Sequence, residues 1–354
     1  MQFSQEDVIE ALRHVEEPDL KQDLISLNMV RDISIQGAEL RFTVILTTPA
    51  CPLKEVIRKR CEDAIHQHIG AQVKVQVDMD AEVTTQRKNT PLLPDVKNIV
   101  AIASGKGGVG KSTVSANLAL ALAQSGARVG LIDADIFGPS LPLMFGVEDE
   151  KPSVTQQGER SFIVPIEKLG VKIISMGFLS PAESAVVWRG PMASKALQQF
   201  IGDTLWGELD YLLVDLPPGT SDIHLTLTQS LPLTGAVIVT TPQKVALADA
   251  RKGLAMFRQA QINVPILGVV ENMSYFTPEE LPDKKYYIFG EGGGALFARD
   301  NVLPFLGEIP LVQGIRESGD QGIPAVGQTN PITKEAFEAL AEALAQQIAI
   351  RNAA

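Results

Sequence analysis

The chain has 354 residues, of which 45% are hydrophobic, and it carries a formal net charge of −11. Because single hydrophobic cores stop growing at about 250–300 residues, this length favours one large domain together with a smaller one. The acidic balance argues against a broad contact with nucleic-acid phosphates, which requires clustered Lys and Arg side chains.

No segment of the sequence reaches about 18 uninterrupted apolar residues, the length that a membrane-spanning helix needs. The first residues also lack the cationic stretch followed by an apolar run that marks a secretory signal. The two cysteines, Cys51 and Cys61, are a poor disulfide framework and are consistent with a reducing compartment. We therefore expect a cytoplasmic protein that binds neither nucleic acid nor a membrane.

Residues 1–80 are predicted to form a small α+β domain with the order helix, hairpin, helix, strand. Apolar residues alternate along residues 40–46, as in a half-buried strand. A helix is expected to start at Pro52, and its apolar face is formed by Leu53, Val56, Ile57, Cys61, Ala64 and Ile65. Residues 73–77 suit a closing strand, and the polar, proline-containing segment 81–97 is typical of a linker.

Residues 98–354 contain apolar runs that alternate with helical stretches, which favours a doubly wound α/β domain with a mostly parallel sheet. The runs cover residues 99–103, 129–132, 173–176, 211–214, 236–240 and 266–270. Near-continuous apolar runs of this kind are required where both faces of a strand are covered by crossover helices. The chain ends in an amphipathic helix with Phe337, Leu340, Leu344 and Ile348 on one face, which we expect to dock on this domain.

The loop from Gly105 to Ser112 follows the first of these runs and precedes a helical stretch. Its glycines, with Asp133 at the end of the next run, fit the G-x-G-x-x-G fingerprint of dinucleotide-binding proteins. The same loop also fits the stricter pattern G-x-x-x-x-G-K-[ST], which has a lysine and a hydroxyl that a dinucleotide loop does not use. We therefore predict a P-loop that binds ATP, rather than a dinucleotide site or a glycine turn without a ligand.

In a P-loop, glycines let successive backbone N–H groups turn inward around phosphate oxygens, and the helix N-terminus adds a favourable dipole. Lys111 reaches the β- and γ-phosphates, Ser112 supplies a hydroxyl to Mg²⁺, and Thr113 contacts the α-phosphate. The predicted nucleotide-binding residues of the loop are Gly105, Lys106, Gly107, Gly108, Val109, Gly110, Lys111, Ser112 and Thr113.

Three aspartates lie at the ends of predicted strands. Asp215 closes the run at 211–214 and suits the role of holding the water shell of Mg²⁺. Asp133 and Asp135 are two residues apart, so both point to the same face if the strand conformation persists. Asp135 is the candidate for orienting the attacking water, and Asp133 for a structural or metal-shell role. Capping of a helix or a loop is the alternative for each of them.

Lys106 lies just inside the loop and gives the sequence K-G-G-V-G-K-S-T, which resembles the deviant Walker A motif of the MinD, ParA and nitrogenase-iron-protein superfamily. This resemblance implies a homodimer in which Lys106 crosses the interface to the nucleotide of the partner. A cation added there stabilises the negative charge that develops on phosphoryl oxygens, so the expected catalytic residues are Lys106, Lys111 and Asp135. A surface lysine without a special role is the alternative for Lys106.

Further segments resemble the Mrp/ApbC iron–sulfur cluster carriers within that superfamily. They are Asp133–Ser140, Trp188–Met192, Asp215–Thr220 and Glu271–Ser274, and the front of the chain, with Glu17–Leu20 and Thr47–Pro52, resembles the small domain of iron–sulfur assembly proteins. The resemblance implies an enzyme that hydrolyses ATP, carries clusters to target apoproteins, works with iron–sulfur assembly factors and reads the adenine with Asn272. A turn-forming asparagine is the alternative for that residue.

The chain departs from that family at one place. Many members have a Cys-x-x-Cys pair after the segment that corresponds to Glu271–Ser274, whereas residues 275–283 contain no cysteine here. Cys51 precedes a predicted helix start, where the helix dipole favours a thiolate, so it is a candidate cluster ligand, with an ordinary loop thiol as the alternative. Cys61 is expected to be a buried small hydrophobe about 15 Å away along the helix, so a cluster bound here should be labile or absent.

Two other functions stay open. A MinD- or ParA-like positioning ATPase would bind membrane or DNA, but the acidic C-terminal helix lacks the basic amphipathic character of a MinD anchor. A scaffold or regulator that binds ATP but has lost cluster transfer fits the missing cysteine pair. The histidines are expected to be structural, because His66 and His68 point to different sides of a helix and His14 and His224 stand alone in the sequence.

Overall fold

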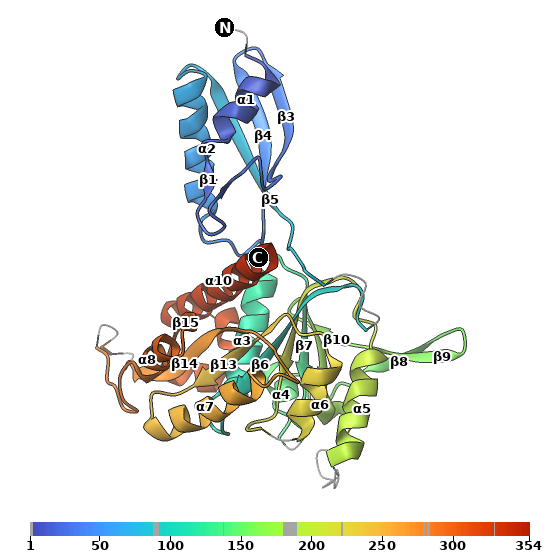
Figure 1. Cartoon of the computed structure of the whole chain (residues 1–354). Helices are drawn as coiled ribbons and strands as arrows, with labels where there is room; N and C mark the ends of the chain where they lie inside the picture. The colour runs from blue at the N-terminus through green and yellow to red at the C-terminus, as the bar shows by residue number, and fades with distance from the viewer. Residues whose placement is uncertain are drawn as a thin grey trace. The chain divides into compact units, whose positions relative to one another are not determined.

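The structure is a computed structural model that describes residues 3–87, 92–136, 138–179, 190–220, 222–278, 280–281, 284–328 and 330–354. It contains two compact units (Figure 1), one running up to Thr85 and including Ile348–Ala354, the other formed by Gln86–Gln347. The boundary between them falls inside the segment 81–97 that we expected to be a linker. The end of helix α10 (Pro331–Ala353), which we expected to belong to the second domain, groups with the first unit, and Asn352 Nδ2 there donates to Thr84 O at 2.9 Å.

Some segments named above lie outside the described residues. They are residues 88–91 of the expected linker, Phe137, Trp188 and Arg189 of the family motifs, and residues 279, 282 and 283 of the segment without cysteines. Among the helices that are described, none is both long enough and apolar enough to cross a membrane.

The first unit packs two helices against a three-stranded sheet with the order β3-β4-β5. Its elements are α1 (Gln5–Leu12), β1 (Glu16–Glu17), β2 (Gln22–Asp23), β3 (Val30–Gln36), β4 (Glu39–Leu46), α2 (Lys54–His68) and β5 (Lys74–Ala81). The predicted alternation is present in β4, where Leu40, Phe42, Val44 and Leu46 are buried. Strand β3 pairs with β4 antiparallel, and β5 pairs with β4 in parallel after the crossover through α2.

Helix α2 differs from its prediction in two respects. It begins at Lys54 rather than at Pro52, because residues 52 and 53 form a turn. Cys61 is fully buried as expected, in a stripe of residues that recur every three to four positions. Val56, which we assigned to the same face, is 43% exposed because it lies one position outside that stripe.

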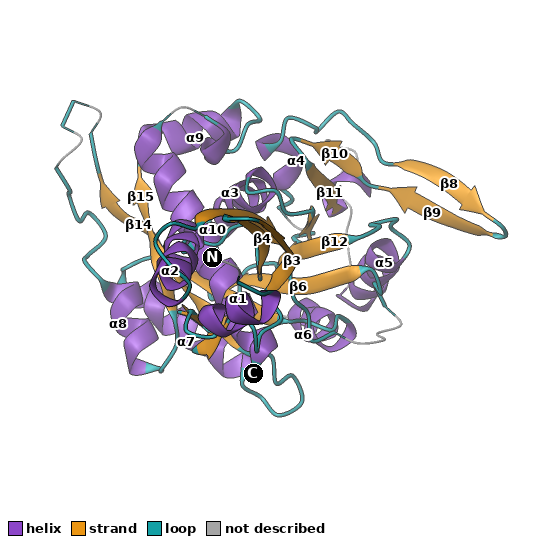
Figure 2. Cartoon of the chain, turned by 90° about the horizontal axis from the view of Figure 1, so that it is seen from above, coloured by secondary structure: helices purple, strands orange, loops and turns teal. Residues whose placement is uncertain are grey.

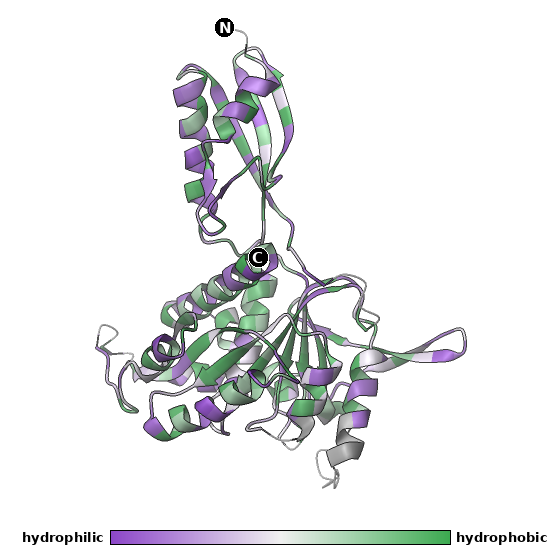
Figure 3. Cartoon of the chain, viewed as in Figure 1, coloured by the Kyte–Doolittle hydropathy of each residue, from purple (hydrophilic) through white to green (hydrophobic). Residues whose placement is uncertain are grey.

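The second unit is a doubly wound α/β domain, as predicted. Its sheet has the strand order β10-β11-β7-β12-β6-β13-β14-β15, and all neighbouring strands are parallel except β10 and β11. The strands are β6 (Val96–Ser104), β7 (Val129–Asp133), β10 (Ile166–Lys168), β11 (Val171–Ser175), β12 (Leu209–Asp215), β13 (Gly235–Thr240), β14 (Ile266–Phe276) and β15 (Phe305–Leu311). Helices cover both faces of the sheet (Figure 2), and its central strands are hydrophobic along most of their length (Figure 3).

The helices of this unit connect the strands and cover them. They are α3 (Lys111–Gln124), α4 (Leu141–Met144), α5 (Gly190–Gly202), α6 (Asp222–Ser230), α7 (Lys244–Phe257), α8 (Gly293–Asp300) and α9 (Gln313–Asp320), with the 3-10 helices η1 (Met176–Leu179) and η2 (Ala325–Gly327). The apolar residues predicted to line one face of α10, Phe337, Leu340, Leu344 and Ile348, are each at most 1% exposed. The sequence did not indicate β10, β15 or the hairpin of β8 (Ser153–Gln157) and β9 (Arg160–Val164), because none of them contains a long apolar run.

The strand order brings the carboxyl ends of β7, β12, β6 and β13 to one edge of the sheet. Strand β6 comes first in this unit, with β12 and β7 on one side of it and β13 on the other. A reversal of strand order of this kind leaves a crevice outside the carboxyl ends, where open α/β sheets bind their ligands. The glycine loop after β6 lies at this crevice.

Candidate nucleotide-binding site

The glycine loop connects β6 to α3, and its backbone adopts conformations that glycine tolerates best. Gly108 and Gly110 have φ angles of +79° and +77°, and Gly110 is the N-cap of α3. A Cβ on Gly105 would lie 2.1 Å from a backbone carbon of Asp249, so the loop and α7 touch directly. A Cβ on Gly107 or Gly108 would meet nothing closer than 3.9 Å, which leaves open space beside this part of the loop.

That space is a cavity of about 220 Å³ at the N-terminus of α3. It is lined by Ser104, Lys106, Gly107, Gly108, Val109, Gly110, Lys111, Ser112, Thr113, Asp135, Ser140, Met144 and Pro218. The N–H groups and the dipole of a helix N-terminus favour an anion, and the first turn of α3 contains no acidic residue. The cavity therefore suits a phosphate chain.

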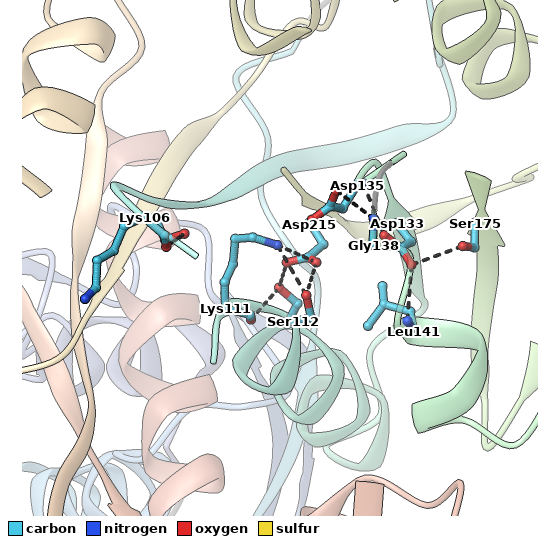
Figure 4. A network of polar contacts seen from close by, with 11 residues as sticks. Lys106, Lys111, Ser112, Asp133, Asp135, Gly138, Leu141, Ser175 and Asp215 are labelled. Carbon is cyan, nitrogen blue, oxygen red and sulfur yellow. Dashed lines mark hydrogen bonds and ion pairs between the residues drawn. The ribbon is translucent and has the colours of Figure 1, made fainter. Parts of the chain in front are cut away.

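Lys111, Ser112 and Asp215 form a compact polar group beside this cavity (Figure 4). Lys111 Nζ donates to Asp215 Oδ2 at 2.7 Å, and Ser112 Oγ donates to the same oxygen at 2.6 Å. Asp215 is fully buried and Lys111 is 6% exposed, so each charge compensates the other, as buried ions require. Ser115 Oγ lies 2.5 Å from Asp215 Oδ1. Sequence reasoning missed Ser115, although a hydroxyl four residues after Lys111 lies on the same side of the helix.

Asp133 lies next to Asp215 but does not line the cavity. Its Oδ2 accepts hydrogen bonds from Leu141 N at 3.1 Å and from Ser175 Oγ at 3.0 Å, and its Oδ1 accepts from Asp135 N at 3.2 Å. Burial, together with the nearby charge of Asp215, raises the pKa of Asp133 to about 7. These contacts suit the structural role, one of the two that we considered for this residue.

Asp135 is the carboxylate of this pair that lines the cavity. Strand β7 ends at Asp133, so the strand conformation that would have pointed both carboxylates to one face does not persist. Asp135 instead lies in a turn, where its Oδ1 accepts a hydrogen bond from Gly138 N at 3.2 Å. It is therefore the carboxylate that a phosphate chain or an attacking water can reach.

The oxygens of Ser112 and Asp215 suit Mg²⁺, which prefers carboxylate, hydroxyl and water ligands. Ser112 Oγ and Asp215 Oδ2 lie 2.6 Å apart beside the phosphate cavity. These two residues, which we predicted for the metal, are thus already adjacent and have the right donor chemistry.

A second pocket, of about 370 Å³, adjoins the first and shares Thr113 and Met144 with it. Its lining residues come from α3, α4, β14, β15, α9 and η2 and are mostly apolar, as is common in small-molecule sites. Asn272 of β14 lines this pocket, and its Nδ2 donates to Val109 O at 2.8 Å. Asn272 therefore fixes the glycine loop from the side of the second pocket.

Lys106 is half-buried, and its side chain points away from Lys111 and Asp215 (Figure 4). Its backbone oxygen accepts a hydrogen bond from Ser104 Oγ at 3.0 Å. The backbone of Lys106 thus stabilises the loop, while its ammonium group is directed away from the polar group of its own chain.

The two cysteines belong to the first unit. Cys61 is fully buried, and burial raises the pKa of its thiol to about 12, as suits the buried hydrophobe that we expected. Cys51 is half-buried and lies two residues before the N-cap Leu53, so it is outside the first turn of α2. Within the part of the chain that the structure describes, no three or more His, Cys, Asp or Glu side chains form a group that could hold a metal ion.

Three contacts of aromatic rings were not predicted. His14, which we regarded as isolated, stacks on His68 with ring centroids 4.2 Å apart, and residues so far apart in sequence give no local signal of such a contact. Tyr275, at the start of the segment without cysteines, meets Tyr287 edge to face with ring centroids 6.3 Å apart. Lys285 Nζ lies 4.0 Å from the ring centroid of Tyr275. Tyr275 therefore makes an edge-to-face contact and a cation–π contact with residues that follow the segment.

Comparisons with known proteins give matches in both units of the chain. A family model described as NUBPL iron-transfer P-loop NTPase matches residues 95–345, and one described as iron-sulfur cluster assembly protein matches residues 5–78. The chain is 49% identical over 347 residues to an iron-sulfur cluster carrier protein of Synechocystis sp., covering 97% of each chain. It is also 49% identical over 348 residues to an iron-sulfur cluster carrier protein of Deinococcus radiodurans, covering 98% of this chain and 96% of that one.

One solved structure extends the comparison to three dimensions. It is described as a nucleotide-binding protein in complex with ADP from Archaeoglobus fulgidus, and it is 39% identical to this chain with a TM-score of 0.59. The match covers 69% of this chain and 93% of that chain.

Proposed function

Because this chain belongs to the NUBPL iron-transfer family of P-loop NTPases, we propose that it binds and hydrolyses ATP and carries iron–sulfur clusters to target apoproteins. The observation that carries the ATPase part is the buried pair of Lys111 and Asp215 beside a glycine-lined cavity. A role in stability alone does not explain this pair, because buried ion pairs are often no more stabilising than apolar residues of similar volume.

In this proposal the cavity residues divide the work of phosphoryl transfer. The loop N–H groups and Lys111 hold the β- and γ-phosphates, and Thr113 holds the α-phosphate. Ser112 and Asp215 hold Mg²⁺, which when bound supplies positive charge to the phosphate oxygens. Asp135 orients the attacking water, since it is the cavity-lining carboxylate next to the loop.

The working state that we propose is a homodimer in which Lys106 of each subunit reaches the nucleotide of the other. The direction of the Lys106 side chain, away from the Lys111–Asp215 pair of its own chain, supports this arrangement (Figure 4). An additional cation at the γ-phosphate favours the transition state, in which negative charge builds up on phosphoryl oxygens. Dimer formation would thus complete the catalytic site.

The second pocket is proposed to bind the adenine. It adjoins the phosphate cavity at Thr113, where a nucleotide bound by its phosphates would extend its base. Asn272 uses its Nδ2 to hold Val109 O, which leaves its amide oxygen as an acceptor for the exocyclic amine of adenine. Guanine has an oxygen at the corresponding position and would be disfavoured.

The cluster is the cargo of this protein, and Cys51 is the ligand that we propose for it. Two subunits supply only two Cys51 thiolates, so the remaining ligands come from small thiols, histidine or the apoprotein that receives the cluster. Weak attachment of this kind suits a carrier that must release what it binds. Iron–sulfur assembly factors that load the cluster are the other proposed partners, and the cytoplasm is the location that we predict.

ATP turnover with Mg²⁺ tests the proposed nucleotide site. We expect Lys111→Ala to abolish turnover, because the lysine that holds the phosphates is lost. Lys334→Ala, which removes a lysine of α10 that is 49% exposed, is the matched control and should keep full turnover. Unchanged turnover in Lys111→Ala would contradict the site.

The iron and sulfide that the protein binds distinguish a cluster carrier from the two alternative functions. A scaffold or regulator that has lost cluster transfer would hydrolyse ATP but never acquire iron and sulfide. A positioning ATPase would instead bind anionic vesicles or DNA in the presence of ATP.

A further inference from the structure

Helix α4 lies between the turn at Asp133–Asp135 and the second pocket. Its first N–H, on Leu141, donates to Asp133 Oδ2 at 3.1 Å, while Asp133 Oδ1 accepts from Asp135 N at 3.2 Å. Its last residue, Met144, lines both cavities, and Leu143 lines the second pocket. The helix therefore contacts the catalytic turn at one end and the proposed base pocket at the other.

Backbone hydrogen bonds continue along the whole length of α4, between Leu141 at its start and Met144 at the pocket. Met144 N donates to Ser140 O at 3.1 Å, Phe145 N to Leu141 O at 3.1 Å, and Val147 N to Pro142 O at 2.9 Å. Phe145 is fully buried and anchors the segment in the core. Backbone hydrogen bonds thus link the pocket end of α4 to Leu141.

Gly146 and Gly322 join the segment after α4 to the segment after α9, backbone against backbone. A Cβ on Gly322 would lie 2.6 Å from Gly146 Cα, and a Cβ on Gly146 would lie 3.3 Å from Gly322 O. Both residues have positive φ angles, +60° for Gly146 and +74° for Gly322. Because a side chain at Gly322 would force the backbone apart, the segments after α4 and α9 are in direct backbone contact only with glycine at this position.

Helix α9 forms a wall of the second pocket. The residues that it contributes are Ile315, Arg316, Ser318, Gly319 and Asp320. Leu143 of α4 is 49% exposed, so it offers an apolar surface that a bound base would cover. The wall formed by η2 is tied to α3, since Val326 N donates to Asn117 Oδ1 at 2.8 Å. A base in this pocket would contact α4 and α9 together.

We propose that α4 couples the base pocket to the catalytic turn, so that a bound base fixes α4 and α4 fixes Asp135 through the carboxylate of Asp133. In this proposal the Gly146–Gly322 contact positions α4, because it holds α4 against α9, which forms a wall of the base pocket. This coupling rests on the proposed ATPase function. If this coupling exists, the base of ATP raises kcat, and does not only strengthen the binding of the triphosphate.

The test compares ATP with inorganic tripolyphosphate, which has the phosphate chain without ribose and base, on the full chain with Mg²⁺. In the unmodified protein kcat should be higher for ATP by about tenfold or more, because catalytic geometry improves when α4 is fixed. Gly322→Ala separates α4 from α9, so it should lower kcat for ATP by about tenfold and change kcat for tripolyphosphate by less than about twofold. Gly158→Ala is the matched control, since Gly158 has a φ of +64° and no atom within 4 Å of its Cβ position.

Leu143→Ala is a second variant that needs no change of the backbone and decides the matter if Gly322→Ala does not fold. It should also lower kcat selectively for ATP. The coupling would be overturned if the unmodified protein had equal kcat values for both substrates. It would also be overturned if the variants lost kcat equally for both substrates, or if only KM changed. If the unmodified protein hydrolyses neither substrate, the ATPase function itself is contradicted.

Discussion

Asp133 and Asp215 are register partners at the carboxyl ends of the neighbouring parallel strands β7 and β12. Both carboxylates are buried, but their partners differ. Asp215 is paired with Lys111 and bonded to hydroxyl groups, whereas Asp133 accepts from two backbone N–H groups and one hydroxyl, and its pKa is raised to about 7. The site therefore has one ion-paired carboxylate suited to a metal and one that positions the turn carrying Asp135.

Mixing two impaired variants tests whether Lys106 acts on the nucleotide of a partner. Lys106→Ala removes the cation and Asp135→Ala removes the carboxylate, so each variant alone should turn over ATP at least about tenfold more slowly. In a mixed dimer one of the two sites regains both groups. An equal mixture should therefore recover about a quarter of the unmodified turnover if subunits assort at random.

ATP turnover of the separate and the mixed proteins is the measurement for this prediction. A mixture of Lys106→Ala with Lys111→Ala serves as a comparison, because the second variant still donates Lys106 but has lost its own site. Action in trans is excluded if the first mixture is no more active than the average of its two components.

Asn272→Asp keeps the size of the side chain but replaces the donor Nδ2 with an oxygen that faces the carbonyl of Val109. Loss of the 2.8 Å hydrogen bond and repulsion between the two oxygens should weaken ATP binding by about ten- to a hundredfold. Asn272→Ala should in addition lose the preference for ATP over GTP, as measured by titration calorimetry. Asn301→Asp is the control, since Asn301 Nδ2 makes a similar 2.8 Å hydrogen bond to Phe297 O at the end of α8. Equal nucleotide affinities of the Asn272 and Asn301 variants would refute the role of Asn272.

His224 should make the stability of the fold depend on pH. It is fully buried in α6, and burial lowers its pKa to about 4 from an ordinary value of 6.5. Because the folded state favours the neutral ring, this stabilisation is complete above pH 6.5 and is lost as the pH falls from 6.5 towards 4. The loss should be on the order of 3 kcal/mol in the free energy of unfolding.

Urea denaturation across that pH range measures the effect. The free energy of unfolding of the unmodified protein should fall by this amount relative to that of His224→Gln between pH 6.5 and 4, because glutamine does not titrate and the contribution of Asp133, which has the opposite sign, is the same in both proteins. His66→Gln, which changes a surface imidazole, should leave the pH dependence as in the unmodified protein. The same pH dependence in His224→Gln and in the unmodified protein would count against this assignment.

The P-loop could be predicted because its chemistry depends on residues that are adjacent in sequence. Backbone requirements specify Gly108 and Gly110, and the phosphates specify Lys111 and Ser112. Asp215 could also be placed near them, since the carboxyl ends of parallel strands meet at one edge of the sheet. The apolar runs alone were enough to predict the central parallel strands of the sheet, because strands covered on both faces are apolar along their length.

Contacts between distant segments could not be predicted in the same way. Ser175, which holds Asp133, carries no pattern that indicates its partner. The wall that α9 contributes to the second pocket and the approach of Gly146 to Gly322 arise only when separate segments pack together. The hairpin of β8 and β9 is mostly polar, so its sequence resembles that of a loop.

The central claim is that this chain carries iron–sulfur clusters, and the iron and acid-labile sulfide bound after anaerobic purification and reconstitution test it most directly. The unmodified protein and Cys61→Ala should bind similar amounts of both, because Cys61 is fully buried, whereas Cys51→Ser should lose most of them. If Cys51→Ser still loads the same iron and sulfide, Cys51 is not a ligand. If the unmodified protein never acquires iron and sulfide, the carrier function is contradicted.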